Sequence, residues 1–398
     1  MKDKGILTPQ KTAQDLNDYS LIVHSHLQWD WVWQRPQQFI SRLSHKHRVL
    51  FVEAPEICAD TAATEVQLRQ VDQFPNVHVV KITVPANRST DLHWVDQERG
   101  RAVESLLSGP LRQKFSSIIQ WFYDPMAATA FAGRFNEQLI VYDCMDELSL
   151  FRGAAPELVQ RERELLRLAD VVFAGGPKIW RAKRKLNRNC FCYGCGVDAE
   201  HFGRARDPKL VVAKELTDVP RPVFGYIGVV DERIDYDLLA KLADSTKGSI
   251  AMVGPSTKID IRDLPRRNNL HWIGGRQYTD LPSYAKAFDV CIMPFAMNEA
   301  TRFINPTKAL EYMATGRPIV STPVEDVVAQ FNNVITIADG AAAFTEACAR
   351  AAAQPEMWRI EQGLALAALS SWDSIVARLE QRIAEALCSR RALSMDAA

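Results

Sequence analysis

Residues 289–322 have the sequence DVCIMPFAMNEATRFINPTKALEYMATGRPIVST, which predicts a strand, a polar loop, a helix and a second strand. The apolar run at 289–295 is typical of a buried strand. Asn305 or Thr307 can cap the helix, and Gly316 is a typical residue for its end. Open parallel sheets bind ligands at the carboxyl ends of their strands, so this loop and the start of the helix form a candidate binding site.

Lys308 and Glu311 stand three residues apart at the start of this helix. At a rise of about 1.5 Å per residue they lie about 4.5 Å apart along its axis, on one face. The free N–H groups at the helix start attract phosphate, and Lys308 adds a positive charge. Glu311 could accept hydrogen bonds from both hydroxyls of a ribose. The pair therefore fits a nucleoside diphosphate, although a surface ion pair has the same spacing.

Short apolar runs followed by helical segments recur along the whole chain, a pattern typical of parallel strands joined by crossover helices. The runs lie at 20–25, 47–54, 77–84, 116–123, 138–144, 170–175 and 189–194 in the first half, and at 221–228, 248–254, 269–274, 289–295, 317–322 and 333–338 in the second. The sequence therefore predicts an α/β protein with two Rossmann-like doubly wound sheets in tandem.

The domain organisation follows from the position at which this alternation of strands and helices begins again, near residue 221. We expect an N-terminal domain at 1–205, a linker at 206–220 that is rich in charges and prolines, and a C-terminal domain at 221–369. The amphipathic helix at 370–398 is expected to pack back on the N-terminal domain. A ligand cleft should open between the two domains.

The composition excludes several classes of protein. Hydrophobic residues make up 47% of the 398 residues, which is typical of a globular protein and not of a disordered one. The 48 Lys and Arg equal the 48 Asp and Glu, so no net positive charge is available to hold a nucleic acid. No run is long and apolar enough for a membrane span, and the N-terminus lacks a signal peptide core, so we expect a cytoplasmic protein.

The cysteines do not indicate a metal site. Eight are scattered along the chain, as in proteins with reduced thiols, and only Cys190, Cys192 and Cys195 cluster. Structural zinc sites need four ligands, and the fourth is missing here. We expect no metal.

Five motifs occur in the order in which one enzyme family has them, namely GVDAEHF (196–202), GYIG (225–228), VGP (253–255), LPSYAKAFDVCIMPF (281–295) and NPTKALEYMATGRPIVST (305–322). Together they resemble the donor half of GT-B glycosyltransferases, most closely the family 4 type and its bacterial polysaccharide relatives. WDWVWQRPQQFISRL (29–43) is similar to the first strand-to-helix loop in a subgroup that acts in cell-surface glycan assembly. The resemblance implies two domains facing across a cleft, with a nucleotide sugar in the C-terminal domain and the acceptor in the N-terminal domain.

The resemblance also implies roles for individual residues of the donor half. Glu311 matches the carboxylate that binds the ribose, and Lys308 matches a contact to the diphosphate. The other donor-binding candidates are Gly225, Gly228 and Arg233 near the phosphates, Arg276 and Tyr278 near the base, Asn298, Thr301 and Arg302 for the sugar hydroxyls, and Thr307 at the start of the helix. GYIG could instead be only a strand-ending turn, and Tyr278 only a surface side chain.

One departure from the family leaves the stereochemistry open. Family 4 enzymes commonly have a second Glu eight positions before the ribose-binding one, where this sequence has Phe303. The sugar contact of that residue is unassigned, so retention of configuration does not follow.

Three acids lie at the end of the predicted strand at 138–144, and an inverting transfer needs a group that takes the proton of the acceptor hydroxyl. Asp146 is the first candidate for this base, and Asp143 is the second. The third acid is Glu147. Alternatively, these acids cap the helix that follows.

The acceptor site is expected around the Trp-rich loop that follows the first strand. Aromatic faces pack on sugars or lipids, while neighbouring polar groups orient hydroxyls. The candidates are His26, Trp31, Gln34, Arg35, Tyr123 and Asp124. The same tryptophans could equally pack in the core or between the domains.

The segment 178–189 carries six basic residues and no acid. Such an excess suits anionic lipid head groups, so peripheral contact with the inner face of the cell membrane is one interpretation. A solvated helix face is the other.

The sequence as a whole predicts a metal-independent glycosyltransferase. It would move a sugar from a nucleoside diphosphate sugar, most simply a UDP-sugar, to a hydroxyl of a cell-surface glycan or lipid-linked acceptor, with no other cofactor. No Asp-x-Asp motif stands at a strand end to demand a metal, and no dinucleotide or P-loop motif is present. The alternatives are a nucleotide-sugar epimerase of the same fold and a non-catalytic nucleotide-sugar binding partner.

Overall fold

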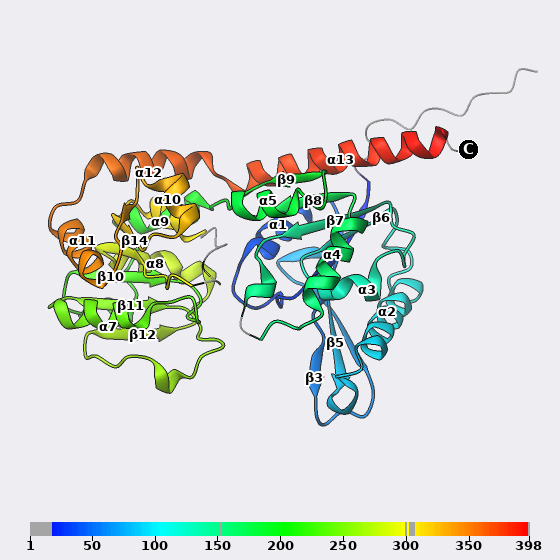
Figure 1. Cartoon of the computed structure of the whole chain (residues 1–398), viewed down its shortest axis with the longest axis horizontal. Coiled ribbons are helices and arrows are strands. Elements are labelled where there is room, and N and C mark those ends of the chain that lie inside the picture. Colours follow the sequence, from blue (N-terminus) through cyan, green and yellow to red (C-terminus); the bar gives the residue numbers. More distant parts are fainter. Residues whose placement is uncertain (1–17, 152, 299–300, 302–306, 397–398) are drawn as a thin grey trace, which may run out of the picture.

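A computed structural model describes residues 18–151, 153–298, 301 and 307–396 (Figure 1). In this part of the chain the strands form two separate sheets, each with helices packed on it. All neighbouring strands are parallel except for one hairpin in the first sheet. The prediction of an α/β chain with two doubly wound sheets is confirmed.

The first sheet has the order β3-β5-β2-β1-β6-β7-β8-β9, with β4 paired to β5. Its strands are β1 (Ser20–Ser25), β2 (Arg48–Glu53), β3 (Glu56–Cys58), β4 (Glu65–Val71), β5 (Phe74–Pro85), β6 (Ile118–Phe122), β7 (Leu139–Cys144), β8 (Val171–Ala174) and β9 (Cys190–Cys192). The order runs outward in both directions from β1 and β6. This is the topological switch point at which open α/β sheets bind ligands.

Helices cover both faces of the first sheet because the strand residues are apolar on both sides. Leu21 and Val23 of β1 face one core, and Ile22 faces the other. The first core contains α1 (Arg35–Leu43) and α13 (Trp372–Asp396); the second contains α2 (Leu92–Ser108), α3 (Ala128–Phe131), α4 (Leu158–Leu168) and α5 (Pro177–Lys183).

The second sheet has the order β12-β11-β10-β13-β14-β15 and is parallel throughout. Its strands are β10 (Val223–Ile227), β11 (Ser249–Val253), β12 (Leu270–Gly274), β13 (Val290–Met293), β14 (Ile319–Ser321) and β15 (Thr336–Ile337). Its helices are α7 (Tyr236–Ser245), α8 (Leu281–Ala287), α9 (Lys308–Thr315), α10 (Glu325–Phe331), α11 (Ala341–Ala353) and α12 (Met357–Leu369). The order reverses between β10 and β13, so a second switch point lies beside α9.

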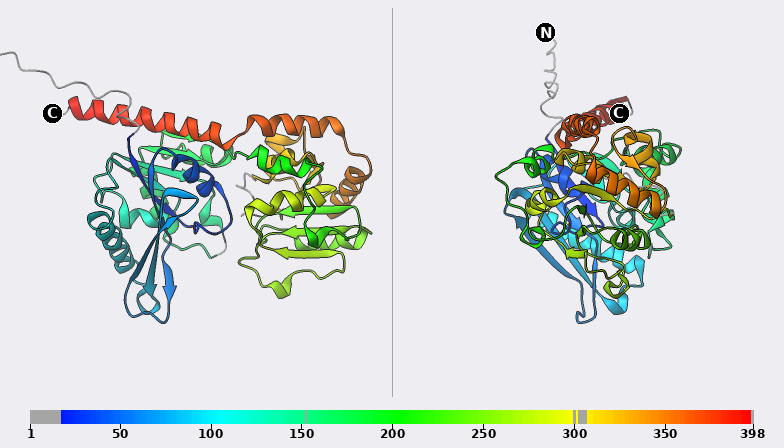
Figure 2. Two further views of the ribbon diagram at one scale, coloured as in Figure 1. Left: turned by 180° about the vertical axis from the view of Figure 1, so that it is seen from behind. Right: turned by 90° about the vertical axis from the view of Figure 1, so that its left-hand side faces the viewer.

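The chain passes between the two sheets twice. The first passage, after β9, contains the short helix α6 (Ala199–Gly203), whose Phe202 is buried in the second core. The second passage joins α12 to α13, which follow one another along one edge of the molecule, α12 beside the second sheet and α13 beside the first (Figures 1 and 2). Trp372 and Leu379 of α13 are buried in a core of the first sheet. None of the helices in the described ranges is both long and apolar enough to cross a membrane.

The hairpin of β4 and β5 contains the main element that the sequence pattern missed, which is β4, whereas β5 matches the apolar run at 77–84. The hairpin projects at the edge of the molecule opposite α13 (Figure 2). Most of β4 is exposed, so its sequence EVQLRQV lacks the apolar run that marks a buried strand. Backbone pairing with β5, from Glu65–Thr83 onward, forms the strand instead.

Candidate active site

Three pockets lie where the loops of the two sheets meet. The central pocket is lined by Gln34, Arg35 and Asp146 from the first sheet's side and by Arg233, Lys308 and Glu311 from the second's. Lys308 and Glu311 also line a hairpin pocket, which reaches the turn of the β4–β5 hairpin. Gln34, Asp146 and Arg233 also line an α2–α4 pocket. The pockets hold about 870, 1960 and 1550 Å³, partly open to solvent, and their shared walls make them one cleft.

Lys308 and Glu311 lie together in this cleft at the start of α9. Lys308 Nζ is 3.4 Å from Glu311 Oε2, a distance at the long end for a hydrogen bond. A Cβ built on Gly228, after β10, would lie 2.7 Å from Lys308 Cε. A larger residue at this position would displace the end of the lysine side chain from the end of β10. The ammonium group of Lys308, which is only weakly bonded, can bind an anion. The buried carboxylate of Glu311 beside it can accept hydrogen bonds from hydroxyls.

Arg233 brings a second cation to the central pocket. Its guanidinium donates to both oxygens of Asp231, at 2.7 to 3.0 Å. Burial alone would lower the pKa of Arg233, but the bonds to Asp231 raise it, so the side chain stays charged. The side chain is fixed between the central and α2–α4 pockets.

Asp146 faces Arg233 from the end of β7. It lines both of these pockets, and within the described ranges its carboxylate has no hydrogen-bond donor. Burial raises the pKa of Asp146, whereas the charges of Arg233 and His26 lower it. It does not cap a helix: the 3₁₀ turn Leu148–Leu150 begins after Glu147, with no side-chain cap. The Asp146 carboxylate lies at the pocket wall and receives no hydrogen bond from the described residues, so it can accept a proton from a bound molecule.

Asp143 is not available to a substrate, which corrects the prediction that it could react. It is fully buried, and Arg35 Nε donates to both of its oxygens at 3.0 and 3.2 Å. Arg35 also donates to the carbonyls of Tyr193 and Gly194 at 2.8 and 3.0 Å. Arg35 lines the central pocket, but its bonds fix it to β7 and to the chain after β9.

Some of the predicted acceptor-binding residues line the cleft, and others are buried in the core. Trp31 is 42% exposed and lines the hairpin and α2–α4 pockets, while His26 and Asp124 line the α2–α4 pocket. Asp124 also accepts from the backbone N–H of Met126, so it caps a 3₁₀ turn. Tyr123 is buried in the core, which corrects its assignment.

The two tryptophans on either side of Trp31 pack in different places. Trp29 is buried edge-on against Phe51 and Phe74. Trp33 lies 6.1 Å from the ring of Tyr278 and so connects the two sheets' loops. The core interpretation of the Trp-rich loop is therefore correct for Trp29 but not for Trp31.

Tyr278 is held between the two halves of the molecule. Its ring stacks on His201 at 4.2 Å, and its hydroxyl accepts a 3.3 Å hydrogen bond from Gln38 of α1. Arg276 donates to Glu215 and to the hydroxyl of Tyr284, at 2.8 and 2.6 Å. Both residues line the hairpin pocket, but one face of the Tyr278 ring is already covered. The alternative that Tyr278 is only a surface side chain is therefore wrong.

Of the candidates between β13 and α9, Asn298 and Thr301 lie outside the three pockets. Asn298 and Thr301 bond to each other through two 3.0 Å hydrogen bonds, and neither lines the cleft. This corrects their assignment to the sugar. Arg302 lies outside the described residues. Thr307 does line the central pocket, where its hydroxyl is 3.4 Å from Cys195 Sγ.

Gly225 has a packing role, which corrects its assignment to the phosphates. A Cβ at this position, in the middle of β10, would lie 2.1 Å from the ring of Phe288. Phe288 is fully buried. The glycine is required so that this ring can pack against the strand.

Gly225→Ala is therefore expected to lower the free energy of unfolding by about 1–3 kcal/mol through overpacking, with nucleotide binding unchanged. Chemical denaturation and nucleotide titration of the same sample measure both. Adding Phe288→Leu should make the loss smaller than the sum of the two single losses. Unchanged stability with weakened nucleotide binding would contradict the packing role.

The basic segment 178–189 is only partly free for other contacts. Lys178 forms an ion pair with Glu325 of α10, and Arg184 packs on Trp180 at 4.3 Å. Lys183 is buried and donates to Glu147 and Glu162 at 2.8 and 2.7 Å. Removing one partner of a buried ion pair typically costs about 3–5 kcal/mol. Lys183 therefore holds the loop that carries Asp146 and is not a lipid contact, which corrects that part of the prediction.

No group of three or more His, Cys, Asp or Glu in the described ranges could hold a metal ion. Cys190 lies in β9, and burial raises its pKa to about 12. Cys195 lines the central pocket, so the three clustered cysteines have different surroundings.

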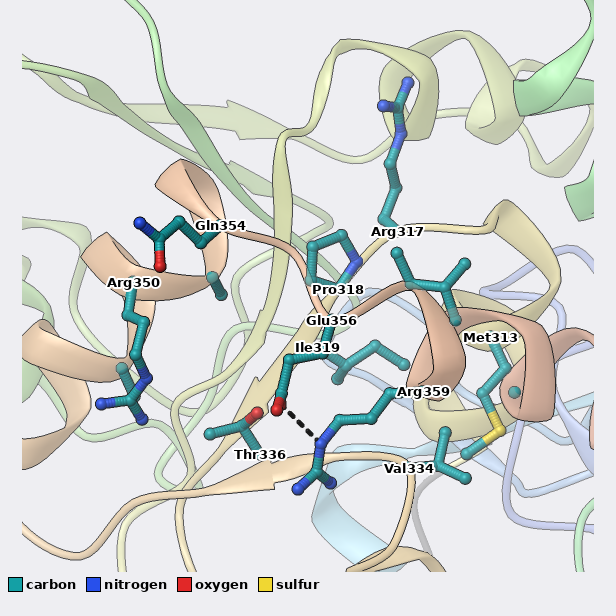
Figure 3. A pocket seen from close by; sticks show the side chains of 14 residues that line it. Met313, Arg317, Pro318, Ile319, Val334, Thr336, Arg350, Gln354, Glu356 and Arg359 are labelled. Carbon is teal, nitrogen blue, oxygen red and sulfur yellow. Dashed lines mark hydrogen bonds and ion pairs between the residues drawn. The ribbon is translucent and has the colours of Figure 1, made fainter.

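A further pocket lies away from this cleft, on the side of the second sheet covered by α11 and α12 (Figure 3). Its floor contains Met313, Ile319 and Val334, and Arg359 at its rim is bonded to Glu356. None of the site candidates lines it. The convergence of those candidates identifies the cleft as the active-site candidate.

Comparison with known proteins agrees with this geometry. Residues 221–354, which contain β10 to β15 and α9, match the family model described as "Glycosyl transferases group 1". The whole of the second sheet lies within this match. The resemblance drawn from the sequence is confirmed.

A curated relative from Bacillus subtilis (strain 168) is named "Putative teichuronic acid biosynthesis glycosyltransferase TuaH". It is 27% identical over 206 residues, which are 46% of this chain and 50% of the relative. The chain thus matches about half the length of this relative.

The solved structures that resemble the chain show its fold. Sucrose-phosphate synthase from Thermosynechococcus elongatus is 16% identical with a TM-score of 0.67, over 93% of this chain and 100% of that one. α,α-Trehalose 6-phosphate synthase from Burkholderia multivorans is 14% identical with a TM-score of 0.63, over 95% and 98%. The two sheets of this chain therefore have the GT-B arrangement.

Proposed function

We propose that the chain is a glycosyltransferase that moves a sugar from a nucleoside diphosphate sugar, most simply a UDP-sugar, to a hydroxyl of a cell-surface glycan or lipid-linked acceptor. The observation that carries this proposal is the placement of Lys308 and Glu311 opposite Asp146 across one cleft. The group 1 domain match supports the donor half. The name of the Bacillus relative supports a role in polysaccharide biosynthesis.

The donor binds on the side of the second sheet in this proposal. Glu311 accepts hydrogen bonds from the ribose hydroxyls, and Lys308 with the N–H groups of α9 holds the diphosphate. Arg233, from the same side, lines both the central pocket and the α2–α4 pocket. The transferred sugar would therefore lie between Lys308 and Asp146.

Transfer then requires one proton and one leaving group to move. The acceptor oxygen attacks the anomeric carbon while Asp146 takes its proton, and the bond from that carbon to the diphosphate breaks. The charge that develops on the diphosphate is stabilised by Lys308 and Arg233, with no metal ion required in this scheme. A base in this position corresponds to inversion of configuration.

The α2–α4 pocket is the reason to prefer transfer over epimerisation. An epimerase holds a single nucleotide sugar, whereas Asp146 here faces a second pocket beside the central one. That pocket gives an acceptor access to the same carboxylate. A non-catalytic binding partner would not need the two pockets to meet at an acid.

Contact with a membrane is a minor part of the proposal. In the segment 178–189, Arg181, Arg184, Lys185 and Arg188 are exposed, as is Leu186. These side chains are compatible with peripheral binding to anionic lipids near a lipid-linked acceptor.

Thermal unfolding with UDP, GDP or dTDP tests the donor site. One of the three nucleotides is expected to raise the melting temperature, because a ligand of the native state stabilises it. Glu311→Ala should weaken this nucleotide by about tenfold, the effect of about 1.4 kcal/mol. Glu346→Ala, an exposed acid of α11, is the matched control and should bind like the wild type. The proposal fails if none of the nucleotides binds or if Glu311→Ala binds normally.

A further inference from the structure

Arg99 of α2 is a buried cation without a hydrogen bond. It is 3% exposed, and none of the residues in the described ranges accepts a hydrogen bond from its guanidinium. Its Nε is fully enclosed. The ring of Phe131, 5.2 Å away, is its packing partner. Buried charges in proteins are normally paired and bonded, so this arrangement requires an explanation.

The neighbouring acids do not supply the missing partner. Asp96 is bonded to Arg161 at 2.8 and 3.1 Å, and Asp124 accepts from the backbone N–H of Met126. Burial lowers the pKa of Arg99, and the charges of Asp124 and Asp96 raise it. The two acids thus favour the charged guanidinium without occupying its donors. The four N–H donors on its two terminal nitrogens remain for a ligand.

The position of Arg99 indicates which ligand these donors could meet. Arg99 lines the α2–α4 pocket but not the central pocket, whereas Asp146 and Arg233 line both. Leu92, Val95 and Phe151 line the same cavity and give it apolar walls. A molecule in this pocket can therefore present a hydroxyl to Asp146 where the pockets join and another group to Arg99.

We propose that Arg99 binds an anionic group, a phosphate or a carboxylate, on the acceptor sugar. A guanidinium binds either group through two parallel hydrogen bonds. The apolar walls would pack on the C–H face of the sugar ring between the anionic group and the reacting hydroxyl. This inference rests on the proposed transferase function, because it takes the α2–α4 pocket as the acceptor site.

A buried and unsatisfied guanidinium would make a neutral acceptor a poor fit. A neutral sugar could offer only hydroxyl oxygens to the Arg99 donors. The positive charge of Arg99 would then have no negative group in direct contact with it. An anionic acceptor would neutralise the charge of Arg99 and accept hydrogen bonds from its donors. This difference would also make the site discriminate against neutral sugars.

Calorimetric titration at low ionic strength with glucose 6-phosphate, glucuronate, glucose and inorganic phosphate tests the proposal. At least one of the two anionic sugars is expected to bind, at least tenfold more tightly than glucose and than inorganic phosphate. Arg99→Met should remove this preference. Arg99→Lys keeps the charge but loses the forked geometry, so its binding should be intermediate. Arg101→Gln changes an exposed arginine of the same helix and should bind like the wild type.

The stability of the free variants separates binding from folding. Because Arg99 has no hydrogen bond to lose among the described residues, Arg99→Met should melt at or above the wild-type temperature. A large fall in melting temperature would show that Arg99 supports the fold, and equal binding of glucose and the anionic sugars would also overturn the proposal. So would equal binding of inorganic phosphate, which would show a simple anion site. UDP titration of the same samples tests the donor site independently.

Discussion

Lys308→Ala is expected to lower kcat/KM for sugar transfer by about 10²–10³-fold, the usual effect of removing one preorganised group that stabilises developing charge. Lys308 lies at the start of α9 beside Glu311, where the leaving diphosphate would gain its negative charge. The loss should appear mainly in kcat, because the charge on the leaving group grows only as the bond breaks. Initial rates with a nucleotide sugar and acceptor measure it.

The fold should tolerate this change. Among the described residues, Lys308 is bonded to Glu311 alone, at 3.4 Å, and such partly exposed ion pairs contribute about 0–1 kcal/mol. Lys241→Ala, an exposed lysine of α7, is the matched control and should leave both rate and stability unchanged. A Lys308→Ala enzyme within threefold of the wild-type rate would contradict the role of the lysine.

The segment around α9 was predictable because its signals are local. The apolar run before it forms β13, and Gly316 adopts the left-handed conformation (φ 68°) that ends α9. Lys308 and Glu311 meet because residues three apart share a helix face, which depends on periodicity alone. The ends of parallel strands then bring these residues to the cleft.

The pairs that join distant parts of the chain were not predictable from such signals. Arg35 and Asp143 are 108 residues apart, and either could have faced a substrate. Gly225 resembles a phosphate-loop glycine in sequence, but the ring of Phe288 decides its role. Arg99 gave no signal because one arginine in an amphipathic helix looks like any surface charge. Only the folded structure shows how deeply each of these residues is buried and which residues it contacts, and these two properties decide its role.

Asp146→Asn is expected to lower kcat by about 10²–10⁴-fold, the range that general base catalysis contributes. The amide has nearly the same size as the carboxylate but cannot take the proton of the acceptor hydroxyl. Because none of the described residues donates a hydrogen bond to this carboxylate, the fold should not depend on it. UDP titration should give the same affinity as in the wild type. Asp60→Asn, on the exposed surface of the same domain, is the control.

The pH profile distinguishes a base from a residue that only shapes the pocket. Burial raises the pKa of Asp146, and a base acts only when deprotonated. The activity should therefore fall with decreasing pH through an acid limb that lies above the ordinary Asp value of about 3.9. In Asp146→Asn this limb should disappear, since the titrating group is gone. An acid limb at the same pH in the variant would mean that another group, such as the neighbouring His26, takes the proton, and the assignment of Asp146 would fail.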